Sequence, residues 1–222
     1  MMRRFKNRRQ AGKILAHELM DYAGRTDVIV LGLPRGGVPV AYEVAMALDA
    51  RLDALVVRKL GAPRNEELAI GALASGGICV VDRKTVAALG ISDTQIAGVI
   101  EREALEVARR DRAYRGERPF PDIPNQIVIV VDDGLATGAT MRVAVETLRK
   151  RHPARIVAAA PIASGEACAI LSLAADECRC VFRPEPFFGA GIWFDDFSQT
   201  SDREVVGLLE DAAARRTEPT AV

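Results

Sequence analysis

The chain has 222 residues, enough for one domain with a sizeable core, and its 30 basic residues balance its 30 acidic residues. This balance excludes a strong overall charge that would attract nucleic acid or a membrane surface. No apolar stretch approaches the ~20 residues that span a bilayer, and residues 1–10 lack the apolar core of a signal peptide. The four cysteines show no metal-binding spacing, so we expect reduced thiols and a cytoplasmic protein.

Short apolar runs alternate with segments whose apolar residues recur at helical spacing, which predicts alternating buried strands and amphipathic helices. In chain order these are a helix over 11–22, a strand over 28–33, a helix over 40–48, a strand over 55–57, a hairpin over 69–81, two helices over 83–115, a strand over 127–131, a helix over 141–151, a strand over 155–160, a helix over 165–173, a strand over 177–182 and a helix from about 202. We therefore expect a single α/β domain over 1–215, with a mostly parallel sheet and helices on both faces. Residues 216–222 are expected to form a disordered tail.

The segment VIVVDDGLATGAT (residues 128–140) carries the most informative pattern in the chain. Its apolar run fits a strand buried on both faces, and Asp132 and Asp133 follow at the carboxyl end, where ligands gather in open α/β sheets. The small residues after them bring backbone N–H groups and hydroxyls close to an anion, at the positive end of the next helix. Because two carboxylates would repel a bare anion, we expect them to bind hydroxyls or a metal-bearing ligand. The predicted ligand is a sugar phosphate; a chance Asp-Asp-Gly turn is the alternative.

The same segment resembles the signature of type I phosphoribosyltransferases, enzymes that use phosphoribosyl pyrophosphate (PRPP). The resemblance implies that Asp132 and Asp133 hold the 2′- and 3′-hydroxyls of the ribose and contact Mg²⁺, directly or through water. It places the 5′-phosphate in the loop formed by Ala136, Thr137, Gly138, Ala139 and Thr140. We expect a branched side chain at Gly138 to enter the space of the phosphate and to restrict the backbone.

A second glycine turn, Pro34-Arg35-Gly36-Gly37, follows the first predicted strand and reaches the same edge of the sheet. Glycines there permit unusual backbone angles and close approach to a ligand. The matching turn of the family is the pyrophosphate loop, often with a strained or cis peptide, which implies that Arg35 and Gly36 contact pyrophosphate. Without the resemblance, the turn is an ordinary connection between a strand and a helix.

Arg58 and Lys59 close the second predicted strand, where the family often has a basic pair. Two cations can neutralise a leaving pyrophosphate, since Arg58 offers a planar fork and Lys59 a point charge. Residues 60–67, including Arg64 and Glu66, follow where the family places a mobile catalytic loop that shields the reaction from water. The alternative is a solvated turn with charged surface residues.

Segments near the two ends of the chain, residues 1–10 and 184–200, are expected to form a small hood over the acceptor. The resemblance implies a base pocket there, for which Trp193, Phe194 and Asp195 are the candidates. Aromatic faces can stack on a base, and a carboxylate can accept hydrogen bonds from its N–H groups. The alternative is that these aromatic residues simply pack against the core.

Ala136 departs from one branch of the family, because members that act on 6-oxopurines carry an acid/base Asp at this position. The acceptor therefore stays open. The resemblance implies an enzyme that transfers ribose 5-phosphate from PRPP to a nitrogen acceptor such as a nucleobase, with Mg²⁺ as cofactor and Lys59, Asp132 and Asp133 as catalytic residues. It also allows a homodimer. The alternative from another class is a PRPP- or nucleotide-sensing regulator that keeps the fold without useful turnover.

Six arginines lie within residues 101–118 and invite a nucleic-acid interpretation. Interleaved acidic residues offset much of this charge, and the pattern favours a solvated helix with salt bridges. We therefore expect PRPP and a small nitrogenous acceptor as partners, and no nucleic acid.

Overall fold

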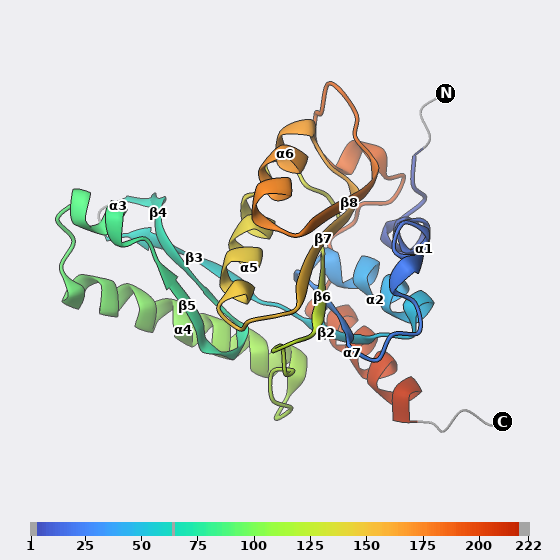
Figure 1. Cartoon of the computed structure of the whole chain (residues 1–222), viewed down its shortest axis with the longest axis horizontal. Helices are drawn as coiled ribbons and strands as arrows, with labels where there is room; N and C mark the ends of the chain where they lie inside the picture. The colour runs from blue at the N-terminus through green and yellow to red at the C-terminus, as the bar shows by residue number, and fades with distance from the viewer. Residues whose placement is uncertain (1–3, 64, 218–222) are drawn as a thin grey trace.

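The computed structural model describes residues 4–63 and 65–217, and its centre is a five-stranded sheet (Figure 1). Neighbouring strands of this sheet are parallel, in the order β2-β1-β6-β7-β8. The strands are β1 (Val28–Gly32), β2 (Arg51–Ala54), β6 (Ile127–Val131), β7 (Arg155–Ile162) and β8 (Glu177–Phe182). Because the apolar runs of β1 and β6 are buried throughout, the sheet is covered on both faces. The predicted α/β fold is confirmed.

Helices supply that cover. One face carries α1 (Arg8–His17) and α2 (Gly37–Leu48), and the other carries α5 (Ala139–Arg149) and α6 (Gly165–Ala174). A short 3-10 helix, η1 (Met20–Tyr22), follows α1. In the part of the chain that the structure describes, no helix is long and apolar enough to cross a bilayer.

The strand order reverses between β1 and β6, because β1 pairs with β2 on one side and with β6 on the other. Gly32 and Val131, the last residues of β1 and β6, stand opposite each other in the register. The chain therefore leaves both strands at one point on the carboxyl edge of the sheet. Open α/β sheets bind their ligands at such a switch point, so the two turns singled out in the sequence meet where the fold favours a site.

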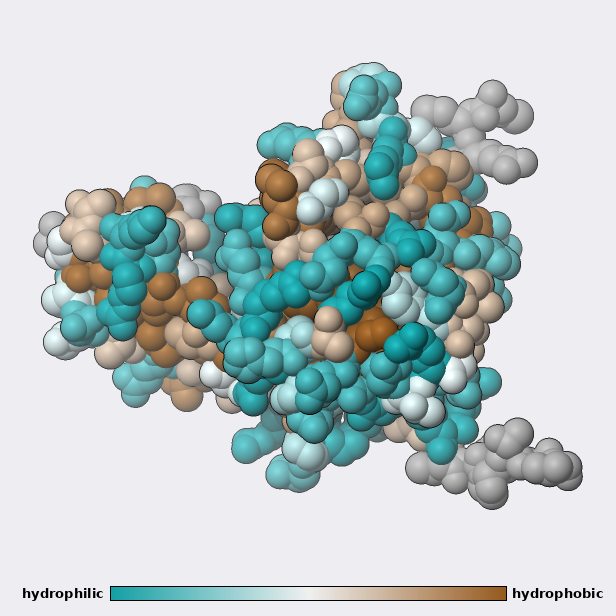
Figure 2. Space-filling view, viewed as in Figure 1, coloured by the Kyte–Doolittle hydropathy of each residue, from teal (hydrophilic) through white to brown (hydrophobic). Residues whose placement is uncertain are grey.

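Residues 57–115 form an arm that projects from the core (Figure 1). Hydrophobic residues gather on the surface of the arm, whereas a hydrophilic band crosses the surface of the core (Figure 2). The arm holds an antiparallel sheet, in the order β3-β4-β5, and two helices. Its elements are β3 (Val57–Ala62), β4 (Asn65–Ala74), η2 (Ser75–Gly77), β5 (Ile78–Val81), α3 (Arg83–Ala88) and α4 (Asp93–Arg115). The predicted hairpin and the two predicted helices are confirmed. The strand predicted over 55–57 is wrong, because residues 55 and 56 only connect β2 of the core to β3 of the arm.

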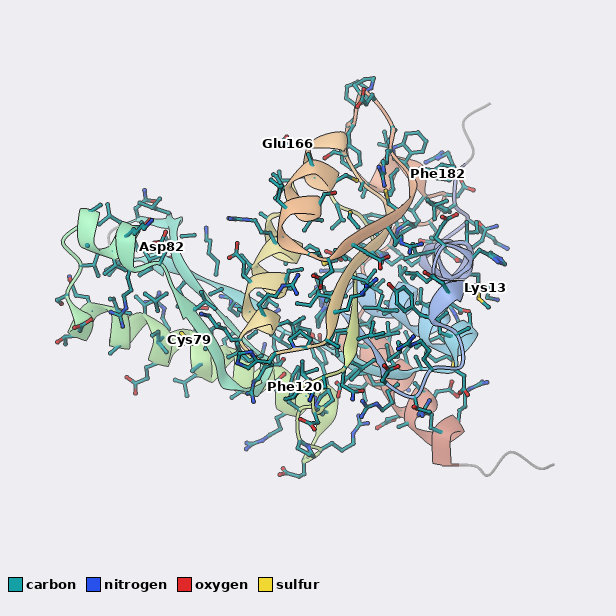
Figure 3. The ribbon with its side chains drawn as sticks, viewed as in Figure 1. Lys13, Cys79, Asp82, Phe120, Glu166 and Phe182 are labelled. Carbon is teal, nitrogen blue, oxygen red and sulfur yellow. The ribbon has the colours of Figure 1, made fainter. Side chains whose placement is uncertain are left out.

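Helix α4 runs from the tip of the arm back to the core. A capping box between Ser92 and Gln95 starts it. At its other end Arg115 is buried, forms an ion pair with Asp53 of β2 (3.1 Å) and lies over the ring of Phe120 (5.2 Å from its centroid), which Figure 3 shows at the base of the arm. These contacts tie the arm to the central sheet.

The two terminal segments that were predicted to form a hood lie against each other. Phe5 N–H donates to Trp193 O (2.8 Å), and Asp195 N–H donates to Phe5 O (2.8 Å), around a bridge between Phe5 and Phe194. The ring of Phe5 also packs 5.4 Å from that of Phe182 at the end of β8 (Figure 3). Another 3-10 helix, η3 (Gly191–Trp193), lies within the C-terminal part of the hood.

The closing helix, α7 (Asp202–Thr217), begins where the sequence predicts it. It continues through residues 216 and 217, which were predicted to belong to the disordered tail. Residues 218–222 of that tail, and residues 1–3 of the predicted hood, lie outside the described residues. α7 packs against both α2 and α4, so it too joins the core to the arm.

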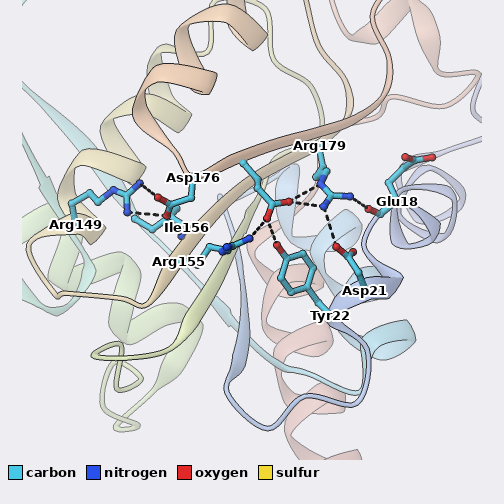
Figure 4. A network of polar contacts seen from close by, with 9 residues as sticks. Glu18, Asp21, Tyr22, Arg149, Arg155, Ile156, Asp176 and Arg179 are labelled. Carbon is cyan, nitrogen blue, oxygen red and sulfur yellow. Dashed lines mark hydrogen bonds and ion pairs between the residues drawn. The ribbon is translucent and has the colours of Figure 1, made fainter.

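A polar network fastens the amino edge of the sheet, at the end away from the switch point (Figure 4). Glu177, the first residue of β8, accepts hydrogen bonds from the Tyr22 hydroxyl (2.6 Å) and from Arg179 Nε (2.8 Å). Next to it, Arg149 at the end of α5 binds Asp176 through two bonds of 2.8 Å. Hydrogen bonds between charged side chains therefore stabilise this edge of the sheet, away from the candidate site.

Candidate active site

The turn after β1 and the turn after β6 lie against each other. Leu33 N–H donates to Val131 O (2.9 Å), and a Cβ at Gly37 would lie 2.6 Å from the same oxygen. A Cβ at Gly36 would overlap the carboxylate of Asp133. At Gly37 the backbone of the other turn leaves no room for a side chain, whereas at Gly36 a side chain would have to displace the Asp133 carboxylate.

The peptide bond between Pro34 and Arg35 is cis, as the resemblance implied for this turn. The backbone of the turn lies at the switch point, next to the acid pair. The structure therefore brings the predicted pyrophosphate turn and the predicted ribose-binding acids to one place.

Asp132 and Asp133 stand at the carboxyl end of β6, as predicted. The backbone N–H of Asp133 donates to Oδ1 of Asp132 (2.9 Å). Burial, and then the negative charge of Asp133, raise the pKa of Asp132 well above the ordinary value of an aspartate. A cation or several hydroxyl donors placed on the pair would relieve this unfavourable concentration of negative charge.

Arg8, the first residue of α1, closes over the acid pair from the hood. Its Nε donates to Oδ2 of Asp133 (2.7 Å), its guanidinium stacks on the ring of Phe197 (3.9 Å to the centroid), and its Nη1 donates to Ser198 O (2.6 Å). Sequence reasoning missed Arg8, because 125 residues separate it from Asp133 and no spacing signal links them. Arg8 therefore connects both terminal segments to the second acid.

The small-residue loop after the acids lines a cavity of about 190 Å³. Its walls are Asp132 and residues 134–141. Ser164, the N-cap of α6, supports the loop from behind, since its hydroxyl donates to Ala136 O (2.5 Å). The cavity ends at the start of α5, where the first N–H groups of a helix have no acceptor within the helix. The cavity and its N–H donors therefore suit a phosphate. Sequence reasoning missed the supporting role of Ser164, because no local pattern links it to the loop.

Gly138 is held in a backbone conformation that favours glycine. Its φ of +69° lies in the left-handed region, and a Cβ there would lie 3.3 Å from Ala167 of α6. A side chain at this position would therefore strain the backbone of the loop, as expected. The expectation that it would also enter the phosphate space stays a prediction.

Arg58 and Lys59 lie inside β3, on the arm, and do not close a strand of the central sheet. Arg58 Nε donates to Glu103 of α4 (2.9 Å), whereas Lys59 is exposed and points to the opposite face of the strand, since side chains alternate. The expected mobile loop over 60–67 is largely built into β3 and β4, and its Arg64 lies outside the described residues. The action of Arg58 and Lys59 on pyrophosphate stays a prediction.

The hood residues proposed for the base pocket have three different environments. Phe194 is 2 % exposed and packs 4.8 Å from the ring of Phe197, which is the core-packing alternative. Trp193 is half-buried, and its indole Nε1 is buried with no hydrogen-bond partner among the described residues. Asp195 is exposed and lies 3.6 Å from Arg4. Base binding by these residues stays a prediction. The ring of Phe194 does not support it, because that ring is enclosed in the core.

Helix α4 is the solvated, salt-bridged helix that the sequence predicts. Arg109 and Arg110 both bind Glu106 (2.8 and 2.7 Å), and together they hold the pKa of Glu106 at about 2. Near the core end of α4 these two arginines also share a cavity with Arg35 of the pyrophosphate turn. The sequence had assigned Arg35 to the pyrophosphate turn and the arginines of α4 to a solvated helix, with no link between them.

Within the described ranges, no three His, Cys, Asp or Glu side chains gather closely enough to hold a metal ion by themselves. Asp132 and Asp133 offer two carboxylates. Proteins commonly bind Mg²⁺ through one or two carboxylates while substrate phosphates supply further ligands. The acid pair therefore fits a Mg²⁺ that arrives with a phosphorylated ligand.

Comparisons with known proteins agree with this geometry. The family profile described as "Phosphoribosyl transferase domain" matches residues 4–169, which include both turns and the phosphate loop. Two proteins of Mycobacterium tuberculosis, from strains CDC 1551 / Oshkosh and ATCC 25618 / H37Rv, are each 41 % identical over 211 residues and are named "Putative phosphoribosyl transferase". The matches cover 95 % of this chain and 47 % of each relative, so the chain spans about half the length of these curated relatives. The crystal structure of TT1426 from Thermus thermophilus matches 94 % of this chain and 98 % of that one, with 38 % identity and a TM-score of 0.84.

Proposed function

The chain belongs to the phosphoribosyltransferase family, and from that premise we propose that it binds PRPP with Mg²⁺ and transfers ribose 5-phosphate to a nitrogen acceptor. The observation that carries the proposal is the meeting of Asp132 and Asp133, the phosphate-binding loop and the Pro34–Arg35 turn at one switch point. A small nitrogenous acceptor such as a nucleobase, a cytoplasmic location and a homodimer belong to the same proposal.

We assign each part of PRPP to a part of the site. The 5′-phosphate fits the cavity at the start of α5, where backbone N–H groups and the helix dipole favour an anion. Asp132 and Asp133 bind the ribose hydroxyls and favour the positive charge that develops on the ribose. The turn at Pro34 and Arg35 then faces the pyrophosphate. Asp132 and Asp133 would hold a Mg²⁺ that arrives with PRPP, and this ion would offset the negative charge of the pyrophosphate.

The proposed transfer exchanges one bond at C1 of the ribose for another. A nitrogen lone pair of the acceptor forms the new bond, and the C1–O bond breaks so that pyrophosphate leaves with the electron pair. Lys59, Arg58 and Arg35 would stabilise that negative charge as it grows. The hood, which Arg8 and Phe197 close, keeps water away from C1 of the ribose. Water would otherwise attack C1 in place of the acceptor.

The Asp132→Asn/Asp133→Asn double variant tests the proposal. We expect it to bind Mg²⁺-PRPP at least about a hundredfold more weakly in calorimetry, because two charged contacts are each replaced by weaker amide contacts. The matched control is Asp21→Asn/Asp27→Asn, which removes two acids that lie apart from the acid pair. Undiminished PRPP affinity in the Asp132→Asn/Asp133→Asn variant contradicts the assignment of the site.

A second candidate function, a PRPP- or nucleotide-sensing regulator, is favoured by one observation. Glu103 already binds Arg58, one of the cations expected to act on the leaving pyrophosphate. Pyrophosphate release from PRPP, measured across a panel of bases, amines and amides, separates the two candidates. Release with any acceptor supports the enzyme, whereas tight PRPP binding without release across the panel supports the regulator.

A further inference from the structure

A cavity of about 440 Å³ opens beside the pyrophosphate turn, between that turn, the core end of α4 and the start of α7. It is lined by Pro34, Arg35, Arg109, Arg110, Tyr114 and Asp202. Three of these residues are arginines, contributed by two segments that are more than seventy positions apart in the sequence. No feature of the hood or of the phosphate loop accounts for this concentration of guanidinium groups.

The cavity keeps a positive charge after its ion pairs are counted. Among the described residues, the ion pairs of Arg109 and of Arg110 are both made with Glu106, so one positive charge is left over on α4. Arg35 adds another, and Asp202, which attracts Arg109 electrostatically, is the carboxylate that lines the cavity with them. Asp202 accepts a hydrogen bond from the Tyr114 hydroxyl (2.6 Å), which engages this carboxylate at the wall of the cavity.

Tyr114 does not add negative charge. Its side chain is buried, and this burial, followed by the hydrogen bond to Asp202, raises its pKa to about 12. The phenol therefore stays neutral near pH 7 and serves as a fixed donor. Arg35 lines the same cavity as Tyr114, so it faces the space between the turn, α4 and α7.

These features select an anion with several phosphate oxygens. Arginine binds such groups through paired, planar hydrogen bonds, and three guanidinium groups around one space suit a diphosphate better than a single carboxylate. The cavity shares Pro34 and Arg35 with the turn that faces the pyrophosphate of PRPP. We infer that Arg109 and Arg110 of α4, together with Arg35, hold the pyrophosphate group of PRPP, an inference that rests on the proposed function.

The decisive variant is Arg109→Gln/Arg110→Gln, studied in the full chain with Mg²⁺ present. Its matched control is Arg83→Gln/Arg215→Gln, because Arg83 and Arg215 are also exposed arginines that each pair with an aspartate, Asp93 and Asp211. Calorimetry with PRPP, inorganic pyrophosphate and ribose 5-phosphate measures the role of each part of the ligand. Ribose 5-phosphate lacks the pyrophosphate, so it reports on the rest of the site.

We expect the Arg109→Gln/Arg110→Gln variant to lose about tenfold or more in affinity for PRPP and for pyrophosphate, and the control to lose little. Affinity for ribose 5-phosphate should stay within about twofold, because that ligand does not reach α4. The Arg109→Lys/Arg110→Lys variant should recover part of the loss, since it keeps the charge without the planar fork.

Equal pyrophosphate affinity in the variant and the control overturns the inference while the proposed function stands. An equal loss for ribose 5-phosphate also overturns it, because the effect would then be structural. If the wild-type protein binds neither PRPP nor pyrophosphate, both the inference and the proposed function fall. Should the double variant not fold, Arg109→Gln and Arg110→Gln are measured singly against the same outcomes.

Discussion

Gly36 shows how closely single residues of the site depend on one another. Its φ of −63° is open to any residue, so its backbone alone would accept a side chain. What forbids one is Asp133, whose carboxylate occupies the place of a Cβ. The glycine that looks like an ordinary turn residue in the sequence is therefore fixed by an acid almost a hundred positions later.

We predict that Gly36→Ala keeps the fold but displaces the Asp133 side chain and breaks its bond to Arg8. PRPP affinity should fall by about tenfold, or ~1.4 kcal/mol, because one ribose contact is lost. Calorimetry with PRPP measures the loss, and circular dichroism confirms the fold.

The control for Gly36→Ala is Gly98→Ala in α4, where a Cβ would meet open space. That change should stabilise the protein by about 0.5–1 kcal/mol and leave binding alone. Wild-type PRPP affinity in Gly36→Ala contradicts the role given to Asp133.

Elements with a strong local pattern could be predicted, and elements that depend on distant partners could not. β6 and β8 match their predicted ranges because their pattern is local and apolar. β2 was missed because the charged residues Arg51 and Asp53 interrupt its apolar pattern. Their partners lie far along the chain, since Arg51 donates a hydrogen bond to Gln126 and Asp53 forms an ion pair with Arg115. Distant contacts also decide where Arg58 and Lys59 lie. A local pattern does not reveal them, so the prediction assigned these two residues to a strand of the central sheet, whereas they lie on the arm.

At the amino edge of the sheet we predict that Asp176→Asn lowers the free energy of unfolding by about 1 kcal/mol at pH 7, because a paired, half-exposed carboxylate is lost. The Arg149 hydrogen bond lowers the pKa of Asp176 in the folded protein. Since that pKa lies below the unfolded value, the carboxylate stabilises the fold above about pH 4 and loses this effect as the pH falls further.

The difference in the free energy of unfolding between wild type and Asp176→Asn should therefore shrink in acid. Urea unfolding at pH 7 and pH 3 measures it. Asp93→Asn is the control, because Asp93 also pairs with an arginine but is 91 % exposed, and it should change stability little at either pH. A deficit of equal size at both pH values would contradict the assigned sign.

On the scale of the whole molecule, the site combines three bodies of structure: the switch point of the central sheet, the hood and the arm. The local signature predicted the first, since Asp132, Asp133 and the phosphate loop need only one strand and one turn. The hood was predicted from the position of its segments, but Arg8 was not. The arm could be predicted as a hairpin and two helices, yet its orientation, which brings Arg109 and Arg110 to Arg35, follows only from tertiary packing.

Lys59 tests whether the arm takes part in catalysis. If Lys59 acts on pyrophosphate mainly as it leaves, Lys59→Ala should bind Mg²⁺-PRPP within a modest factor of wild type while turnover collapses. We expect a loss on the order of 3 kcal/mol in the barrier, about a hundredfold in rate. Single-turnover pyrophosphate release with an acceptor from the panel measures it. Equal losses in binding and turnover would reduce Lys59 to an anchor.

The hood contains a natural optical reporter. Trp193 is the single tryptophan of the chain, and its side chain is half-buried with the indole Nε1 enclosed. It lies three residues after Ala190, which a side chain at Gly134 would overlap. Any fluorescence excited at the red edge of protein absorption therefore comes from one place, close to the turn that carries the acid pair. We predict that PRPP shifts the emission of the wild-type protein and leaves that of Asp132→Asn/Asp133→Asn unchanged. The response of the hood to PRPP can then be timed in a stopped-flow instrument on the unlabelled protein, before any acceptor is known.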